Sequence, residues 1–297
     1  LHDNPSSSQG QAGSLNNCNS AWRKWNSWCS EHQINPISCD VSAVANYLAV
    51  LFDEKYEYST INGHRSAISA YHDYVDGKPI GEHPRICSLL AGVFNLNPPK
   101  PKAVFVWDVQ IVLDYFDSLK SNEELSVKDL THKLAMLLAL TSASRGLELA
   151  FLDIDYKTRS PNCYTFTIPK LTKSRRRGNP PIMVEYFSFP ENKKLCVVDT
   201  LDAYLKLTEP WRTSGQKQLF LATIRPHNPV VSSTIAGWIK NTLTKVGVDT
   251  ALFLAHSTRS ASTSKAKVNG LSTVDILKRG SWSSESTWQR HYHKFVV

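Results

Sequence analysis

The sequence contains no long hydrophobic run. Its longest uninterrupted apolar stretch is Leu134–Leu140, whereas a helix that spans a membrane needs about 20 apolar residues. A transmembrane protein is therefore excluded, and no signal peptide is recognisable at the start. The first residue is Leu1 rather than methionine, so we expect the sequence to be an excerpt of a longer one.

Several motifs that would define a chemistry are also missing. The six cysteines include no CxxC pair, which argues against a disulfide framework and a zinc finger. We expect buried thiols in a reducing compartment at Cys18, Cys29, Cys39, Cys87, Cys163 and Cys196. The motifs GxxxxGK[ST], HExxH and GxSxG are absent, as is a GxGxxG that follows a strand. We therefore expect no cofactor, no metal ion and no small-molecule substrate.

What remains is the composition of a globular protein with a positive net charge. Hydrophobic residues make up 41% and aromatic residues 10% of the 297 residues, which is enough apolar material for packed cores. Lys and Arg number 34 against 26 Asp and Glu, a formal net charge of +8. At about 150 residues per domain, this length predicts two domains.

A proline-rich segment, 97–102, predicts the boundary between these domains. Its sequence NPPKPK opposes a helix and favours an extended linker. Residues 1–14 are polar and rich in serine, so we expect a disordered tail there. The expected domains therefore cover 15–96 and 103–297.

The first domain is predicted to be all-helical. Apolar residues recur at helical spacing, and Asp40 is placed to cap one of the helices. The predicted helices cover about 22–29, 41–52, 60–74 and 84–94. In the third helix we place Ile61 and Ile68 on the apolar side and expect His64 and Arg65 to lie elsewhere.

The second domain combines helical patterns with two β-like runs. We expect helices at about 107–119, 127–142, 198–207, 232–246, 255–269, 273–278 and 284–292, and strands at 164–168 and 182–187. The strands predict a hairpin whose loop carries a basic cluster of Lys170, Lys173, Arg175, Arg176 and Arg177. The expected fold class is mainly α with a small antiparallel β-sheet.

Seven residues with chemical potential follow one another along this second domain. Arg145 and Glu148 are three apart at the end of an apolar helix, and His256 and Arg259 are three apart at a helix start. The full set is Arg145, Glu148, Lys173, His256, Arg259, Trp282 and Tyr292. Each residue alone is weak evidence, because surface ion pairs and core aromatics are common.

In this order and spacing, the set resembles the tyrosine recombinase (phage integrase) family over about 103–292. That family has an Arg in a TxxRxxEL-like box, a hairpin Lys, an HxxR box, a His or Trp, and a nucleophilic Tyr. The N-terminal part, with Trp22, Trp25, the segment 59–73 and PPKPK, resembles the core-binding domain of recombinases from DIRS-type retrotransposons, including Ngaro-like elements. The resemblance implies a helical DNA-clamp domain followed by a catalytic domain.

The resemblance also implies a metal-independent reaction. Tyr292 would attack a DNA phosphodiester to give a 3′-phosphotyrosyl link and a free 5′-hydroxyl. Arg145 and Arg259 would stabilise the non-bridging oxygens. Lys173 would protonate the leaving oxygen, with Lys170 as a rival for that role.

The other positions receive supporting roles by the same resemblance. His256 would bond the phosphate or assist proton movement from Tyr292, Trp282 would bond the phosphate through its indole N–H, and Glu148 would orient its neighbours. DNA contacts are expected from His64 and Arg65 in the first domain. In the second domain they are expected from the hairpin cations Lys170, Arg175, Arg176 and Arg177.

The implied partner is double-stranded DNA, bound by a homo-oligomer that forms a tetramer on two DNA sites. The implied setting is a eukaryotic mobile element, hence the nucleus and a role in DNA integration or recombination. The chain stops five residues after Tyr292, so the C-terminal helix of many recombinases is either absent or trimmed.

Two alternatives remain open at the level of sequence. A type IB topoisomerase or telomere-resolving enzyme uses the same residue types but relaxes DNA or forms hairpins. A domesticated DNA-binding protein would have lost catalysis, although all the site residues are intact here. Plasmid relaxation against two-site recombination separates the first alternative, and a trapped protein–DNA adduct separates the second.

Overall fold

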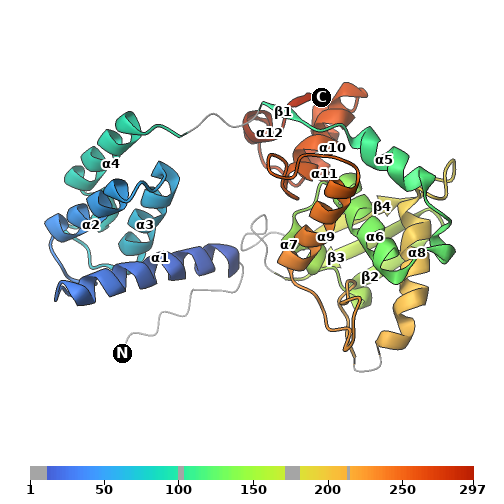
Figure 1. Cartoon of the computed structure of the whole chain (residues 1–297), viewed down its shortest axis with the longest axis horizontal. Helices are drawn as coiled ribbons and strands as arrows, with labels where there is room; N and C mark the ends of the chain where they lie inside the picture. Colours follow the sequence, from blue (N-terminus) through green and yellow to red (C-terminus); the bar gives the residue numbers. More distant parts are fainter. Residues whose placement is uncertain (1–11, 100–103, 171–180, 213–214) are drawn as a thin grey trace. The chain divides into compact units, whose positions relative to one another are not determined.

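A computed structural model describes residues 12–99, 104–170, 181–212 and 215–297 (Figure 1). Contacts divide the chain into two compact units, 1–102 and 103–297, and the division falls at the end of the proline-rich segment. Helix α1 begins at Ala12, so residues 12–14 are helical and the prediction of a tail to residue 14 is wrong there. The rest of that predicted tail, 1–11, lies outside the described residues.

The first unit packs its helices around one apolar core. Its elements are α1 (Ala12–Glu31), α2 (Val41–Asp53), α3 (Tyr58–Tyr71), η1 (Ile80–Glu82) and α4 (Pro84–Leu96). Trp25, Leu48 and Ile61 lie fully buried in this core, as their helical spacing predicts. The Asp40 carboxylate accepts the backbone N–H of Ala43 at 2.7 Å, so the predicted cap of the second helix is confirmed.

The second unit is mainly helical with a small antiparallel sheet, as predicted. Its helices are α5 (Val109–Ser118), α6 (Val127–Ser142), α7 (Gly146–Ala150), α8 (Val197–Thr208), α9 (Ser232–Lys245), α10 (Ser257–Val268), α11 (Thr273–Arg279) and α12 (Glu285–His291). Short 3₁₀ turns occur at η2 (Asn122–Glu124), η3 (Ile154–Tyr156) and η4 (Glu209–Trp211).

The sheet has the order β2 (Lys157–Ser160), β3 (Cys163–Ile168) and β4 (Ile182–Phe187). The expected hairpin is confirmed, since β3 and β4 pair antiparallel with Ile168 opposite Ile182. The third strand, β2, was not predicted because its polar sequence KTRS shows no apolar alternation. A second, parallel pair joins β1 (Phe105–Val106) to β5 (Phe295–Val296), and two-residue strands leave no periodic signal.

Helix α6 is the centre of the second unit. Most of its residues are buried, and it packs against α8, α9, α10 and β4. The helix ends at Ser142, and the backbone of the next residue, Ala143, is left-handed with φ 48°. After this reversal the chain runs through Ser144 and Arg145 directly into α7. The end of the most buried helix therefore fixes the position of Arg145.

The cysteines differ from the expectation of six buried thiols. Among the five whose side chains are described, Cys29 and Cys196 are buried, Cys39 and Cys163 are half-buried and Cys87 is exposed. Cys87 faces outward because α4 turns its apolar side, with Ile86 and Leu90, toward the core. None of these five forms a disulfide.

The described part of the chain has neither a helix suited to cross a membrane nor a cluster of metal-binding side chains. None of its helices combines the length and apolarity that a bilayer crossing requires. No group of three or more His, Cys, Asp or Glu side chains in those ranges is arranged to hold a metal ion.

Lys133 is a charged residue inside the apolar core around α6. Its side chain is fully buried, and its ammonium group donates to the Asn122 Oδ1 atom at 2.9 Å. Desolvation by burial, with a smaller effect from the positive charge of Lys194, lowers the pKa of Lys133 to about 8. The folded protein therefore holds this proton less tightly than the unfolded chain does.

Replacing Lys133 with methionine should stabilise the protein at pH 7 by about 1–3 kcal/mol, because a buried ammonium group costs more than an apolar side chain of similar length. In the unfolded chain the pKa is near 10.5. Wild-type stability should therefore rise between about pH 8 and 10.5, where the unfolded state binds more protons. The Lys133→Met variant lacks this rise, and urea unfolding at pH 7 and pH 9.5 measures the difference.

The control for this experiment is Lys128→Met, on the exposed side of the same helix. Its free energy of unfolding should change by less than about 0.5 kcal/mol at either pH. A Lys133→Met variant that is less stable than wild type at pH 7 would contradict the role we assign to desolvation.

Candidate active site

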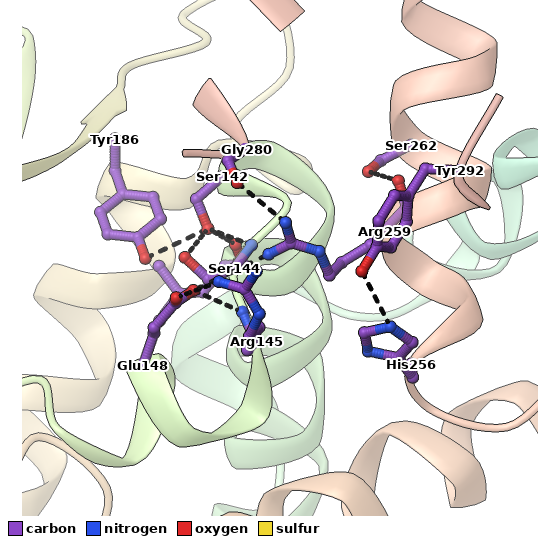
Figure 2. A network of polar contacts seen from close by, with 11 residues as sticks. Ser142, Ser144, Arg145, Glu148, Tyr186, His256, Arg259, Ser262, Gly280 and Tyr292 are labelled. Carbon is purple, nitrogen blue, oxygen red and sulfur yellow. Dashed lines mark hydrogen bonds and ion pairs between the residues drawn. The ribbon is translucent and has the colours of Figure 1, made fainter. Parts of the chain in front are cut away.

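The site begins where α6 ends and α7 starts. The Glu148 carboxylate accepts the backbone N–H of Arg145 at 2.7 Å through Oε2 and its guanidinium Nη1 at 2.7 Å through Oε1. Glu148 is buried, whereas Arg145 is partly exposed. One carboxylate thus fixes both the main chain and the side chain of Arg145 (Figure 2). The side chain of Arg145 stays partly accessible.

Arg259 approaches the same carboxylate from α10 and is 1% exposed. Its Nη2 donates to the Gly280 carbonyl at 2.8 Å, whereas its Nη1 lies 3.8 Å from Glu148 Oε2, too far for a hydrogen bond. Neither Nη1 nor Nε has a hydrogen-bond acceptor within the described chain. Burial, with the charge of Arg145, lowers the pKa of Arg259 below its usual value, but a guanidinium stays charged at neutral pH.

Trp282 covers Arg259 on another side. The guanidinium carbon lies 4.4 Å from the Trp282 ring centroid, within the range of a cation–π contact. The indole Nε1 is buried and finds no acceptor among the residues that the structure describes. Buried donors of this kind are costly unless a partner arrives, so the three donor nitrogens of Arg259 and Trp282 that lack acceptors indicate a site for an anion.

Tyr292 lies directly after α12, and its side chain is next to Arg259 and His256 (Figure 2). Its ring is 4.7 Å from the Trp282 ring and 5.2 Å from the Arg259 guanidinium, measured between ring centroids and from the guanidinium carbon. Its hydroxyl lies 3.5 Å from His256 Nε2. The phenolic oxygen is therefore next to both a potential proton acceptor and a positively charged pocket.

His256 keeps a neutral imidazole at physiological pH. Desolvation by the surrounding protein lowers its pKa, and the charges of Arg259 and Arg145 lower it further. The residue as a whole remains exposed, so the ring is crowded on its protein side and open on the other. A neutral His256 can accept a proton through Nε2, which a protonated ring cannot do.

Six of the seven residues expected from the sequence meet at this place. The structure brings together Arg145, Glu148, His256, Arg259, Trp282 and Tyr292. The seventh, Lys173, lies outside the described residues together with Arg175, Arg176 and Arg177. Lys170 is described and exposed, with its Nζ 4.9 Å from the Phe151 ring centroid.

The two N-terminal residues expected to contact DNA are engaged within their own unit. His64 is buried, and its Nδ1 lies 2.8 Å from the Tyr47 hydroxyl. Ile61, His64 and Ile68 are three and four residues apart, which puts His64 on the apolar face, so its expected place away from that face is wrong. Arg65 Nη1 donates to the Gly81 carbonyl at 3.0 Å, and this contact supports the turn before α4.

Gly280 is a part of the site that was not predicted from the sequence. A Cβ built on this residue would overlap the six-membered ring of Trp282, and its carbonyl holds Arg259. Glycine at this position therefore lets the indole fold back over the guanidinium. A glycine two residues before the expected Trp282 was the available signal, but its meaning depends on how the chain turns there.

No protein-family model matches the chain, and no curated protein matches it. Solved structures do match. The XerH site-specific recombinase bound to difH substrate in a pre-cleavage complex aligns with a TM-score of 0.58 and 15% identity over 86% of this chain and 67% of that one. A lambda integrase dimer bound to a COC′ core site aligns with a TM-score of 0.56 and 15% identity, covering 97% and 90%.

A third match, the Tn1549 transposon integrase in complex with circular intermediate DNA, has a TM-score of 0.54 and 14% identity over 87% of this chain and 82% of that one. These matches share a class, the tyrosine recombinases and integrases. The chain has the fold of that class, as the sequence resemblance predicted. The finer resemblance to recombinases of DIRS-type and Ngaro-like elements gains no support from them.

Substituting Gly280 with alanine should destabilise the protein by about 1–3 kcal/mol, because the added methyl group must displace the Trp282 ring. The matched control is Gly237→Ala in α9, where an added Cβ meets nothing within 4 Å. Removing a helical glycine should leave stability unchanged or raise it by up to about 1 kcal/mol. Equal denaturation midpoints for Gly280→Ala and wild type would show that the ring has room to move.

Removing the charge of Arg145 should raise the pKa of His256. In Arg145→Gln a nearby positive charge disappears and the Glu148 carboxylate loses the nearer of its two ion partners, and both changes favour the imidazolium. NMR titration of the His256 ring measures the shift against wild type. Arg279→Gln is the control, since Arg279 is not among the charges that act on His256, and an unchanged His256 pKa in Arg145→Gln would contradict the electrostatic coupling.

Proposed function

We propose that the protein cleaves and rejoins DNA strands through a covalent 3′-phosphotyrosyl intermediate at Tyr292. The observation that carries the proposal is the set of buried donors on Arg259 and Trp282 that lack acceptors, placed beside the Tyr292 ring. Matching structures of the same fold are described as recombinases and integrases bound to DNA. A DNA phosphate supplies the negative charge and the acceptor oxygens that these donors need.

The electrostatics of the site favour such a ligand. Arg145 and Arg259 both face the single carboxylate of Glu148, and His256 is neutral, so this group carries an excess positive charge. Planar guanidinium groups match the geometry of phosphate oxygens. As the phosphorus becomes pentacoordinate in the transition state, negative charge builds on the non-bridging oxygens, and donors that are already in place stabilise it.

In the proposed step one bond to phosphorus forms and another breaks. The attacking oxygen loses a proton and the leaving oxygen gains one. The Tyr292 oxygen attacks phosphorus, its proton passes to His256 Nε2, and the bond from phosphorus to the 5′-oxygen breaks. The 5′-oxygen must gain a proton as it leaves, and Lys173 is our candidate for the general acid, with Lys170 as the alternative. The product is a phosphodiester to tyrosine, so the reverse attack by a 5′-hydroxyl restores DNA without an external energy source.

Further parts of the proposal rest on the sequence resemblance. We assign DNA clamping to the helical unit before residue 97 and catalysis to the unit after residue 102, and we expect a homo-oligomer on two DNA sites. We also infer a mobile-element origin and a nuclear setting. Metal independence follows from the mechanism, in which guanidinium groups neutralise the phosphate charge.

A nicked suicide DNA substrate tests the function directly. Cleavage near the nick releases a short 5′-hydroxyl fragment that diffuses away, so a covalent protein–DNA adduct accumulates and is seen on a denaturing gel. We expect wild-type protein to form this adduct with EDTA present and Tyr292→Phe to form none, because only the attacking oxygen is lost. Tyr204→Phe is the control, since Tyr204 is buried in the core of the second unit.

Three outcomes would contradict the proposal in different ways. An adduct with Tyr292→Phe would move the nucleophile to another residue. A strict requirement for Mg²⁺ would contradict the metal-independent mechanism. DNA binding without any adduct from wild-type protein would favour the silent DNA-binding alternative.

A further inference from the structure

Tyr292 lies in a short segment that belongs to neither helix nor strand. Helix α12 ends at His291, and β5 begins at Phe295. Such a segment has few backbone hydrogen bonds of its own, so its position depends on contacts from elsewhere. Those contacts come from α10, the helix that also carries Arg259.

Ser264 bridges the segment on the C-terminal side of Tyr292. Its Oγ donates to the Tyr292 carbonyl at 3.1 Å and accepts the backbone N–H of Lys294 at 3.0 Å. The side chain is fully buried. A hydroxyl is both donor and acceptor, so this one group satisfies two main-chain groups that flank the proposed nucleophile.

Thr263 holds the same segment on its N-terminal side. Its Oγ1 accepts the indole N–H of Trp288 at 3.2 Å and donates to the Arg259 carbonyl at 2.6 Å. Trp288 is fully buried, and its carbonyl accepts the backbone N–H of Tyr292 at 2.8 Å. Two adjacent residues of α10 therefore hold the chain before and after Tyr292.

We infer that Ser264 is a positioning residue that fixes the Tyr292 oxygen relative to the anion site of Arg259 and Trp282. The inference rests on the proposed function, and it adds a residue outside the set that touches the phosphate. Because Ser264 and Arg259 belong to one helix, the nucleophile and the phosphate donor keep a common frame. Loss of the Ser264 hydroxyl leaves the Tyr292 carbonyl and the Lys294 N–H without this partner, and the segment gains freedom.

The test is single-turnover cleavage of the suicide substrate by the full chain with Ser264→Ala. A positioning role predicts a first-order rate constant at least about tenfold lower, since misplacement of a reacting group by about 1 Å can cost about 100-fold. The final adduct yield and the affinity for uncleaved DNA should match wild type. A merely structural role predicts the reverse, with an unchanged rate constant and a yield that falls with the folded fraction.

Two further variants make the result decisive. Ser262→Ala is the matched control on α10, because its hydroxyl donates to the Arg259 carbonyl of its own helix at 3.5 Å, and its rate should stay within twofold of wild type. Ser264→Thr retains the hydroxyl and should recover most of the lost rate. A wild-type rate in Ser264→Ala, or a loss confined to yield, overturns the inference while leaving the function intact.

Failure of the proposed function gives a different pattern. If wild-type protein itself forms no adduct, both the function and this inference fall. If wild type forms the adduct and Ser264→Thr is as slow as Ser264→Ala although both are folded and bind DNA, the hydroxyl is not the cause and the inference alone is wrong.

Discussion

A buried guanidinium, that of Arg259, sets the conditions for the rest of the site. Removing such a charge from water costs several kcal/mol, and a nearby carboxylate repays the cost only with good geometry and additional hydrogen bonds. Glu148 is near but not within hydrogen-bond distance of Arg259, and the hydrogen bonds of its two oxygens go to Arg145. The compensation in the described chain is therefore incomplete, and this deficit is what prepares the site for an anion.

The neighbours of Arg259 follow from that constraint. Gly280 supplies a carbonyl to one Nη atom, and the absence of a side chain on Gly280 admits the Trp282 ring. The ring covers the guanidinium and excludes water, which strengthens the electrostatic interactions beneath it. Tyr292 and His256 close another side, so a phosphate that entered would meet the proposed nucleophile and the charge at the same point.

Much of this arrangement could be predicted from the sequence, because local patterns determine it. The limits of α6 agree with the helix predicted at 127–142, and the β3–β4 hairpin agrees with two alternating segments. The order of Arg145, His256, Arg259 and Tyr292 identified residues that do meet in space. That they meet could be expected only from the resemblance to a family, because no local sequence pattern shows that α7, α10 and α12 come together.

The errors arose where packing decides between similar local patterns. His64 has the helical spacing of a core position and pairs with Tyr47, although its polarity suggested an exposed face. Gly280 and Ser264 act through contacts with residues whose place depends on the tertiary fold. The strands β1 and β5 lie at opposite ends of the second unit in sequence, and two residues of strand are too few for a pattern to be read.

The pairing of β1 with β5 has a structural consequence for the start of the second unit. Strand β1 follows soon after residues 100–103, which the structure does not describe. It pairs with β5, the strand that follows Tyr292. Trp107 donates its indole N–H to the Ser257 hydroxyl at 2.9 Å, and Asp108 accepts from Lys265 at 3.0 Å. Both partners lie on α10: Ser257 is between His256 and Arg259 in sequence, and Lys265 follows Arg259. The segment 104–108 thus supports both α10 and the strand that follows Tyr292, the proposed nucleophile. An isolated fragment of the second unit that begins after Asp108 would lack contacts on which the geometry of the site depends.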